Sequence, residues 1–76
     1  MKRAIKYVME NINGAEFEST IDEMFRYRIP FSIANPSLSC TIQDLLDEYA
    51  EDNNLQEGWY GDSIEDFIDE MLKNED

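Results

Sequence analysis

The side chains of this sequence that could do chemistry are its carboxylates, which number eighteen against six lysine and arginine residues. Their distribution is uneven, because from Ile29 to Leu72 there are eleven carboxylates and no lysine or arginine. Carboxylates act as metal ligands, as general acids or bases, or as fixed charges that attract a basic partner. The formal net charge of -12 disfavours contact with nucleic acid or anionic membranes and favours basic protein surfaces.

Catalysis is the least favoured of these uses. The sequence has no histidine, and its single cysteine, Cys40, has no neighbouring base that would activate the thiol. Paired carboxylates alone can cleave glycosidic bonds or hold Mg²⁺, but a chain of 76 residues offers little depth in which to desolvate them. We therefore expect a protein that is not an enzyme and has no catalytic residues.

Calcium is the metal ion that so many carboxylates suit best, so the stretch from Glu51 to Ile64 can be tested against the EF-hand loop. With Gly58 as the sixth residue of that loop, the first, third and twelfth residues are Asn53, Leu55 and Ile64. Two of these three cannot coordinate through a side chain. The motif fails, and we expect no metal site and no cofactor.

Asp62, Ser63 and Ile64 resemble the phosphopantetheine-attachment motif of acyl carrier proteins, which are also acidic helical bundles of about this length. The resemblance would make Ser63 the attachment site. In that family at least two further helices follow the serine, whereas the sequence after Ser63 predicts one. A helix-capping role explains Ser63 better. We therefore rank an acyl-carrier function last of the three functions that the sequence suggests.

The elements that must position the carboxylates are predicted by the spacing of apolar residues. The first apolar stripe has helical spacing and consists of Ile5, Val8, Met9 and Ile12. The dipeptide Asn13-Gly14 then supplies a helix stop. The alternative is a hairpin that turns at this dipeptide and joins strands over residues 5–12 and 15–19.

Three later segments share a helix-start pattern, a hydroxyl residue followed three positions later by a carboxylate and then by two apolar residues. We predict that helices start at Thr20, Thr41 and Ser63. Their apolar stripes are Ile21, Met24 and Phe25; Ile42, Leu45, Leu46 and Tyr49; and Ile64, Phe67, Ile68, Met71 and Leu72. An internal repeat would also fit these starts, but reuse of one start signal by similar helices is the simpler explanation.

The segment between the second and third predicted helices contains Pro30 and Pro36, which interrupt any helix. Apolar residues alternate there as in a short extended segment: Ile29, Phe31 and Ile33. The sequence therefore predicts an all-α fold. We expect one small four-helix-bundle-like domain over residues 1–76, with a proline-containing extended connection between helices 2 and 3.

Trp59 and Tyr60 lie between the last two predicted helices. They either close the core from one end, which we favour, or form an exposed anchor for a partner. The sequence leaves both interpretations open.

The carboxylates of the last two predicted helices lie opposite the apolar stripes on a helical wheel, except Glu65, which lies on the flank of the last helix. A merely solvated face is the simplest explanation of a charge run, and like charges at this spacing slightly destabilise a helix. The absence of any cation over 44 residues favours a functional surface instead. The predicted partner-binding residues are Asp44, Asp47, Glu48, Glu51, Asp52, Asp62, Glu65, Asp66, Asp69 and Glu70.

Carboxylates three or four residues apart on a helix lie roughly 5–6 Å apart, close to the spacing of successive phosphates along a nucleic-acid strand. In size and charge the sequence looks similar to the DNA mimics that phages use against restriction and CRISPR enzymes. We therefore predict a non-catalytic inhibitor, of anti-CRISPR or anti-restriction type, that binds the basic surface of a nucleic-acid-binding protein. The alternative is an acidic adaptor or antitoxin-like module, in which an apolar patch drives binding and charge only steers it.

The basic N-terminus is followed by polar and charged residues that interrupt any apolar run long enough for a signal peptide or a membrane span. We expect a cytoplasmic protein, a monomer or a homodimer, with no direct contact to membranes or nucleic acid.

Overall fold

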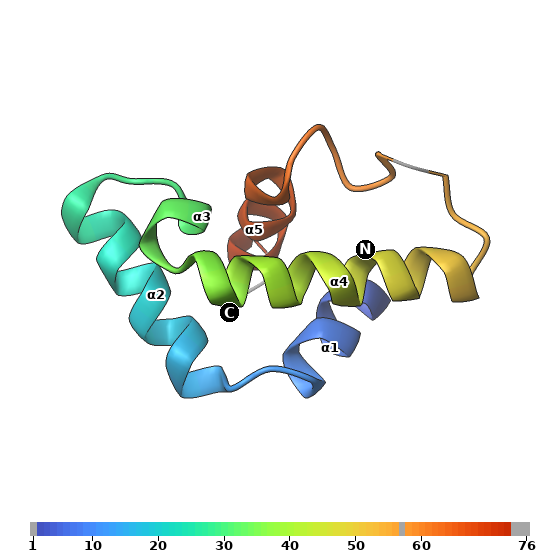
Figure 1. Ribbon diagram of the computed structural model, residues 1–76, viewed down its shortest axis with the longest axis horizontal. Helices are drawn as coiled ribbons and strands as arrows, with labels where there is room; N and C mark the ends of the chain where they lie inside the picture. The colour runs from blue at the N-terminus through green and yellow to red at the C-terminus, as the bar shows by residue number, and fades with distance from the viewer. Residues whose placement is uncertain (1, 57, 74–76) are drawn as a thin grey trace.

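The computed structural model describes residues 2–56 and 58–73, and in this part of the chain all regular structure is α-helical (Figure 1). Five helices follow one another there: α1 (Lys2–Glu10), α2 (Gly14–Tyr27), α3 (Phe31–Ala34), α4 (Pro36–Asp52) and α5 (Ile64–Lys73). The prediction of a mainly helical fold is confirmed. None of these helices has both the length and the apolar character that crossing a bilayer requires.

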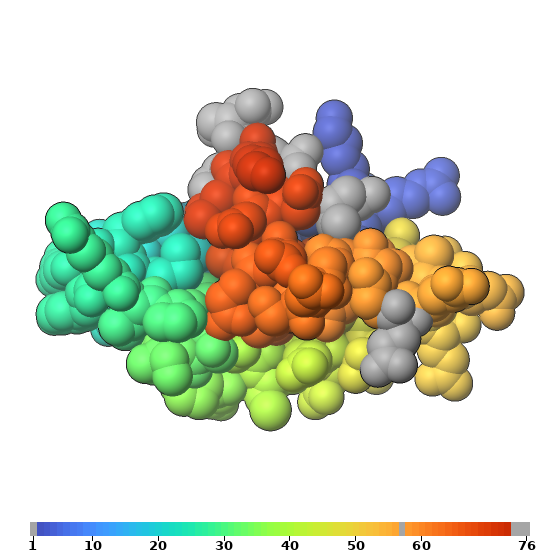
Figure 2. Space-filling view, turned by 90° about the horizontal axis from the view of Figure 1, so that it is seen from above, coloured from blue at the N-terminus to red at the C-terminus, as the bar shows by residue number. Residues whose placement is uncertain are grey.

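The scaffold of the molecule is α4, the longest of the five helices, which runs through the middle of a body of 36 × 22 × 22 Å (Figure 1). It packs against α1 and α3, and α3 also contacts α2 and α5. Between α4 and α5 the chain turns back, so that the orange residues 58–63 lie beside α4 (Figure 2). The largest fully buried side chains come from all of these elements except α2: Phe31, Phe67, Ile42, Leu46, Ile68 and Val8.

The segment that follows Pro30 is helical rather than extended. It forms the short helix α3, in which Phe31 is fully buried while Ile33 is 64% exposed. Pro30 occupies the N-cap position, where its fixed φ and its missing N–H are tolerated. The predicted extended connection is therefore wrong, and so is the predicted set of four helices, because α3 lies between α2 and α4.

The predicted start of the second helix at Thr20 is also wrong. The side-chain oxygen of Asn13 accepts hydrogen bonds from the backbone N–H groups of Ala15 (2.9 Å) and Glu16 (3.1 Å), so α2 begins at Gly14. Thr20 lies inside α2 and is buried. The alternative of a hairpin is excluded, because helices lie on both sides of Asn13-Gly14.

The third predicted helix likewise starts earlier than Thr41. Asn35 caps α4 by accepting a hydrogen bond from the backbone N–H of Leu38 (3.1 Å), and Pro36 is the first helical residue. Proline is favoured at this position because the first helical N–H has no partner within the helix. Thr41 lies one turn further along, where its hydroxyl donates to the carbonyl of Ser37 (3.1 Å).

The predicted helix start at Ser63 is confirmed, since α5 begins at the next residue. Oδ2 of Asp66 accepts hydrogen bonds from the backbone N–H groups of Asp62 (2.7 Å) and Ser63 (3.3 Å), as in the carboxylate half of a capping box. The preceding Gly61 has a φ of +131°, and a Cβ there would lie 2.5 Å from Oδ2 of Asp66. This turn therefore requires glycine at position 61.

The apolar stripes enter the core as predicted, apart from one residue of α2. Ile21 is buried and Met24 is partly buried, but Phe25 is 64% exposed, so its assignment to the core is wrong. Trp59 and Tyr60 are half-buried and pack against the core, as we favoured.

Candidate functional site

The first part of the candidate site is the row of carboxylates on the outer side of α4. We call it the α4 acidic face, and it consists of Asp44, Asp47, Glu48, Glu51 and Asp52. All five residues are exposed, whereas Ile42 and Leu46 on the inner side of the helix are fully buried. A rise of about 1.5 Å per residue spreads the row over about 12 Å. The helical wheel predicted this orientation correctly.

The α4 acidic face has no lysine or arginine partner within the described residues. The ion pairs of the described residues lie on other helices. Arg26 pairs with Asp22 (2.9 Å) on α2, and Lys73 pairs with Glu70 (3.8 Å) on α5. Within residues 2–56 and 58–73, no lysine or arginine therefore neutralises the five carboxylates at short range. Their field reaches into solvent over about a Debye length, roughly 8 Å at physiological ionic strength.

Tyr7 connects α1 to the α4 acidic face. Its hydroxyl donates a hydrogen bond to Oε2 of Glu48 (3.1 Å). This bond raises the pKa of Tyr7 above its ordinary value, and partial burial and the charges of Glu48 and Asp52 act in the same direction. The ring of Tyr7 also packs on Tyr49, with centroids 5.7 Å apart, so α1 contacts the middle of the acidic face.

The predicted carboxylates in and around α5 are divided between the surface and the fold. Asp62 and Asp69 are exposed, whereas Glu65, Asp66 and Glu70 are half-buried. Asp66 accepts the two backbone hydrogen bonds at the start of α5. The second outward row of charge that we predicted is therefore incomplete, because part of it serves the fold.

Glu65 joins α5 to α3. Its Oε1 accepts hydrogen bonds from the hydroxyl of Ser32 (2.6 Å) and from the backbone N–H of Ser32 (3.4 Å). The hydroxyl bond is the main cause that lowers the pKa of Glu65 below its ordinary value, and burial partly opposes it. Glu65 thus acts as a link between helices, a role that the wheel did not predict.

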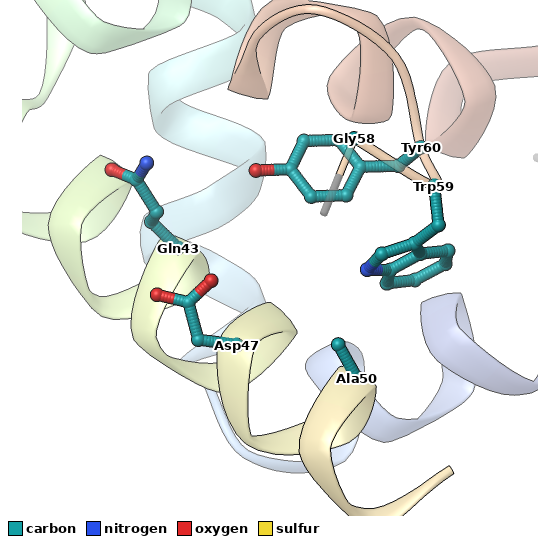
Figure 3. Close-up of a pocket in the computed structure, with 6 residues that line it drawn as sticks. All are labelled: Gln43, Asp47, Ala50, Gly58, Trp59 and Tyr60. Atoms are coloured by element: carbon teal, nitrogen blue, oxygen red, sulfur yellow. The ribbon is translucent and has the colours of Figure 1, made fainter. Parts of the chain in front are cut away.

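A cavity of about 370 Å³ lies where the segment after α4 returns along this helix (Figure 3). Its lining residues are Gln43, Asp47 and Ala50 from α4, and Gly58, Trp59 and Tyr60 from the returning segment. In Figure 3 the Tyr60 hydroxyl points toward the side of α4 that carries Gln43 and Asp47. Positions 43, 47 and 50 share one helical face, but the sequence does not show which segment covers that face. The cavity was therefore not predicted.

Large apolar side chains are exposed around the connection between α2 and α3. They are Phe25 (64% exposed), Tyr27 (62%) and Ile33 (64%), and we call them the α2–α3 apolar residues. The apolar stripe of the second predicted helix placed Phe25 in the core, Ile33 was expected in an extended segment, and Tyr27 was given no role. Exposed aromatic residues of this kind are enriched at protein–protein contacts.

Two observations on the described residues concern metal ligands and the thiol. No group of three or more His, Cys, Asp or Glu side chains there is arranged to hold a metal ion. Cys40 is exposed and forms no disulfide.

Comparisons with known proteins do not assign the chain to a family. No family model matches it, and no curated protein or solved structure matches it significantly.

Proposed function

We propose that this chain is a non-catalytic acidic protein that occupies the basic nucleic-acid-binding surface of another protein and so keeps nucleic acid out, as DNA-mimic inhibitors do. One observation carries the proposal. The α4 acidic face presents five exposed carboxylates on a single helix, with no lysine or arginine partner within the described residues.

The rigidity of the α4 acidic face supports this function. Ile42 and Leu46 anchor α4 in the core, and Tyr7 ties its outer side to α1. Charges held on a packed helix lose little conformational entropy when a partner binds them. Their spacing of roughly 5–6 Å suits a groove of lysine and arginine side chains that normally holds phosphates.

The net charge supports the proposed class of partner. At -12 the chain repels nucleic acid and attracts basic surfaces, and this attraction raises the rate of encounter with a nucleic-acid-binding protein. Proteins that cut or process nucleic acid, including restriction and CRISPR enzymes, present such surfaces. An inhibitor of that type is the specific form of our proposal.

The test is reversal of charge on α4. In the triple variant Asp44→Lys, Glu51→Lys and Asp52→Lys, each change adds two charges, so the formal net charge moves from -12 to about -6. The three residues are exposed and make no side-chain hydrogen bond within the described residues, so the domain should stay folded. Immobilised wild-type protein should capture nucleic-acid-binding proteins from nuclease-treated lysate at low salt, and the variant should not.

A matched control separates the α4 acidic face from charge in general. Glu10→Lys, Glu16→Lys and Glu23→Lys change the net charge by the same amount, at exposed positions on α1 and α2. This control should capture the same proteins as the wild type. If both variants lose capture equally, or if neither variant loses it, the assignment of binding to α4 is refuted.

A second candidate function is favoured by the α2–α3 apolar residues. In an adaptor or antitoxin-like module these side chains would supply the binding energy, while charge would only steer the encounter. The double variant Phe25→Ser and Tyr27→Ser distinguishes the two functions. If it abolishes capture while the α4 triple variant retains it, the adaptor function replaces the inhibitor function.

A further inference from the structure

The cavity between α4 and the returning segment has two aromatic walls that are held at a right angle. The rings of Trp59 and Tyr60 have centroids 5.3 Å apart and an interplanar angle of 89°. The fully buried Phe67 supports both rings, with centroids 6.3 Å from Trp59 and 5.9 Å from Tyr60. On the side of α4, Tyr49 packs on Trp59 at 5.6 Å. The walls are therefore fixed before any ligand binds.

The side of the cavity that α4 forms carries a carboxylate. Asp47 is exposed and forms no hydrogen bond or ion pair within the described residues, so its charge is available to a ligand. Gln43, one turn earlier on the same face, adds an amide that can accept or donate a hydrogen bond. In Figure 3 both side chains lie on the cavity side of α4, facing the segment that carries Trp59 and Tyr60.

This combination selects for a cation. The faces of tryptophan and tyrosine rings attract positive charge, and a carboxylate beside them adds a direct ionic partner. An anion would meet Asp47 and the field of the whole α4 acidic face, whereas an apolar ligand would desolvate the carboxylate without pairing it. A volume of about 370 Å³ is at the small end of the range for ligand sites, and it suits a single side chain.

Among cations, a guanidinium group fits better than an ammonium group. Guanidinium is planar, so it can stack on an aromatic face while its N–H groups donate two parallel hydrogen bonds to a carboxylate. An ammonium group is a compact, strongly hydrated charge that cannot stack in this way. The geometry points to a binding site for the arginine side chain of a protein partner, between Asp47 and the rings of Trp59 and Tyr60.

The identity of the partner rests on the proposed function, since surfaces that bind nucleic acid are rich in arginine. In that setting the α4 acidic face attracts the basic surface, and the cavity holds one arginine of it. A buried arginine beside aromatic rings is a frequent centre of binding energy at protein interfaces.

The test needs no partner protein, because the chain has a single tryptophan. The NMR signal of its indole N–H is titrated with N-acetyl-arginine amide, and in parallel with the citrulline and lysine analogues. We expect a saturable shift with the arginine compound, weaker binding of the lysine compound and no binding of the neutral citrulline compound. If either analogue binds as tightly as the arginine compound, or if arginine gives no saturable shift, the assignment is overturned.

The variant Asp47→Asn removes the carboxylate at nearly constant shape. It should weaken arginine binding about ten-fold, because a charge-assisted hydrogen bond is lost. The control Glu23→Gln removes one negative charge from α2, away from the cavity, and should leave binding within about two-fold, since only the general field changes. If both variants weaken binding equally, or Asp47→Asn has no effect, the site is wrong.

The outcomes separate this inference from the proposed function. If arginine fails to bind while the α4 triple variant still loses its captured proteins, the cavity assignment fails and the inhibitor function stands. If arginine binds as expected while capture is unaffected by charge reversal on α4, the cavity stands and the inhibitor function fails.

Discussion

Replacement of Gly61 by alanine should disturb the turn that leads from Trp59 and Tyr60 into α5. Gly61 has a φ of +131°, a conformation that residues with a Cβ rarely adopt. A Cβ at this position would lie 2.5 Å from Oδ2, 2.6 Å from Cβ and 2.8 Å from Cγ of Asp66. Because Asp66 accepts the backbone hydrogen bonds that start α5, it cannot move away without losing them.

The expected loss of stability follows from these two effects. A backbone conformation that strains a non-glycine residue costs about 1–3 kcal/mol. Weakening of the two exposed hydrogen bonds to Asp66 adds about 0.5–1 kcal/mol each. We therefore expect Gly61→Ala to lower the free energy of unfolding by about 3 kcal/mol, which for a domain of this size corresponds to a fall of about 12–24 °C in Tm.

The other two glycines serve as graded controls. Gly58 has a φ of +83° but only one contact, with the carbonyl of Gly61 at 3.8 Å, so Gly58→Ala should cost about 1 kcal/mol from strain alone. Gly14 starts α2 and has nothing within 4 Å of an added Cβ. Gly14→Ala should be neutral, or should stabilise the protein by up to about 1 kcal/mol through helix propensity.

Urea unfolding followed by far-UV circular dichroism and by fluorescence of Trp59 measures all three variants. Equal losses for Gly58→Ala and Gly61→Ala would refute the role given to the contact with Asp66. A second check is Asp66→Ala in the Gly61→Ala background, because removal of the side chain should remove the clash. The two changes should therefore be non-additive, and additive losses would count against the account.

Three further predictions concern the contacts between helices. Ser32→Ala should lower the free energy of unfolding by about 1 kcal/mol at neutral pH. Because the folded-state pKa of Glu65 lies below its ordinary, unfolded value, this contribution is present above the unfolded pKa and is lost as the pH falls through the folded pKa. The difference in urea stability between wild type and variant should therefore shrink in acid, and a constant difference would contradict the link between α3 and α5. Asn35→Ala removes the α4 cap and a hydrogen bond to α2, so it should lower the unfolding free energy by about 1–2 kcal/mol, and an unchanged urea midpoint would argue against the cap. Phe17→Ala should lower the free energy of unfolding by about 3–5 kcal/mol and Phe25→Ala by less than about 1 kcal/mol, since these residues are 3% and 64% exposed. Similar thermal midpoints for the two variants would show that the burial is misassigned.

Helix faces could be predicted from the sequence because they depend on a fixed rotation per residue. The spacing of Ile42 and Leu46 places them on the inner side of α4, and the same geometry places the α4 acidic face in solvent. The stripe of α5 enters the core for the same reason, with Phe67 and Ile68 almost fully buried.

Helix ends were predicted less well, because several residues compete to cap one helix. Asn13 and Asn35 are strong N-caps, but each stands beside a residue, Gly14 or Pro36, that also signals a helix stop. Thr41 carries the signature of a capping box and yet lies within α4. Local pattern alone does not decide between such signals.

The finer parts of the site depend on contacts between distant segments. The hydrogen bond between Ser32 and Glu65 joins residues 33 positions apart, and it turns a predicted binding residue into a structural one. The cavity beside Asp47 exists because the segment with Trp59 and Tyr60 returns along α4. Phe25 is exposed although its spacing fits the core, because no element among the described residues covers that side of α2.

The most direct test of the account is a competition between this chain and nucleic acid for one protein. A nucleic-acid-binding protein captured by the wild type is mixed with a fluorescent DNA duplex, and fluorescence anisotropy is followed as the chain is added at low and at high salt. We expect the chain to displace the duplex at low salt, to lose this ability as ionic strength rises, and to lack it in the α4 triple variant. A ternary complex in which the captured protein holds the duplex and the chain together would contradict the central claim that the α4 acidic face occupies a nucleic-acid-binding surface.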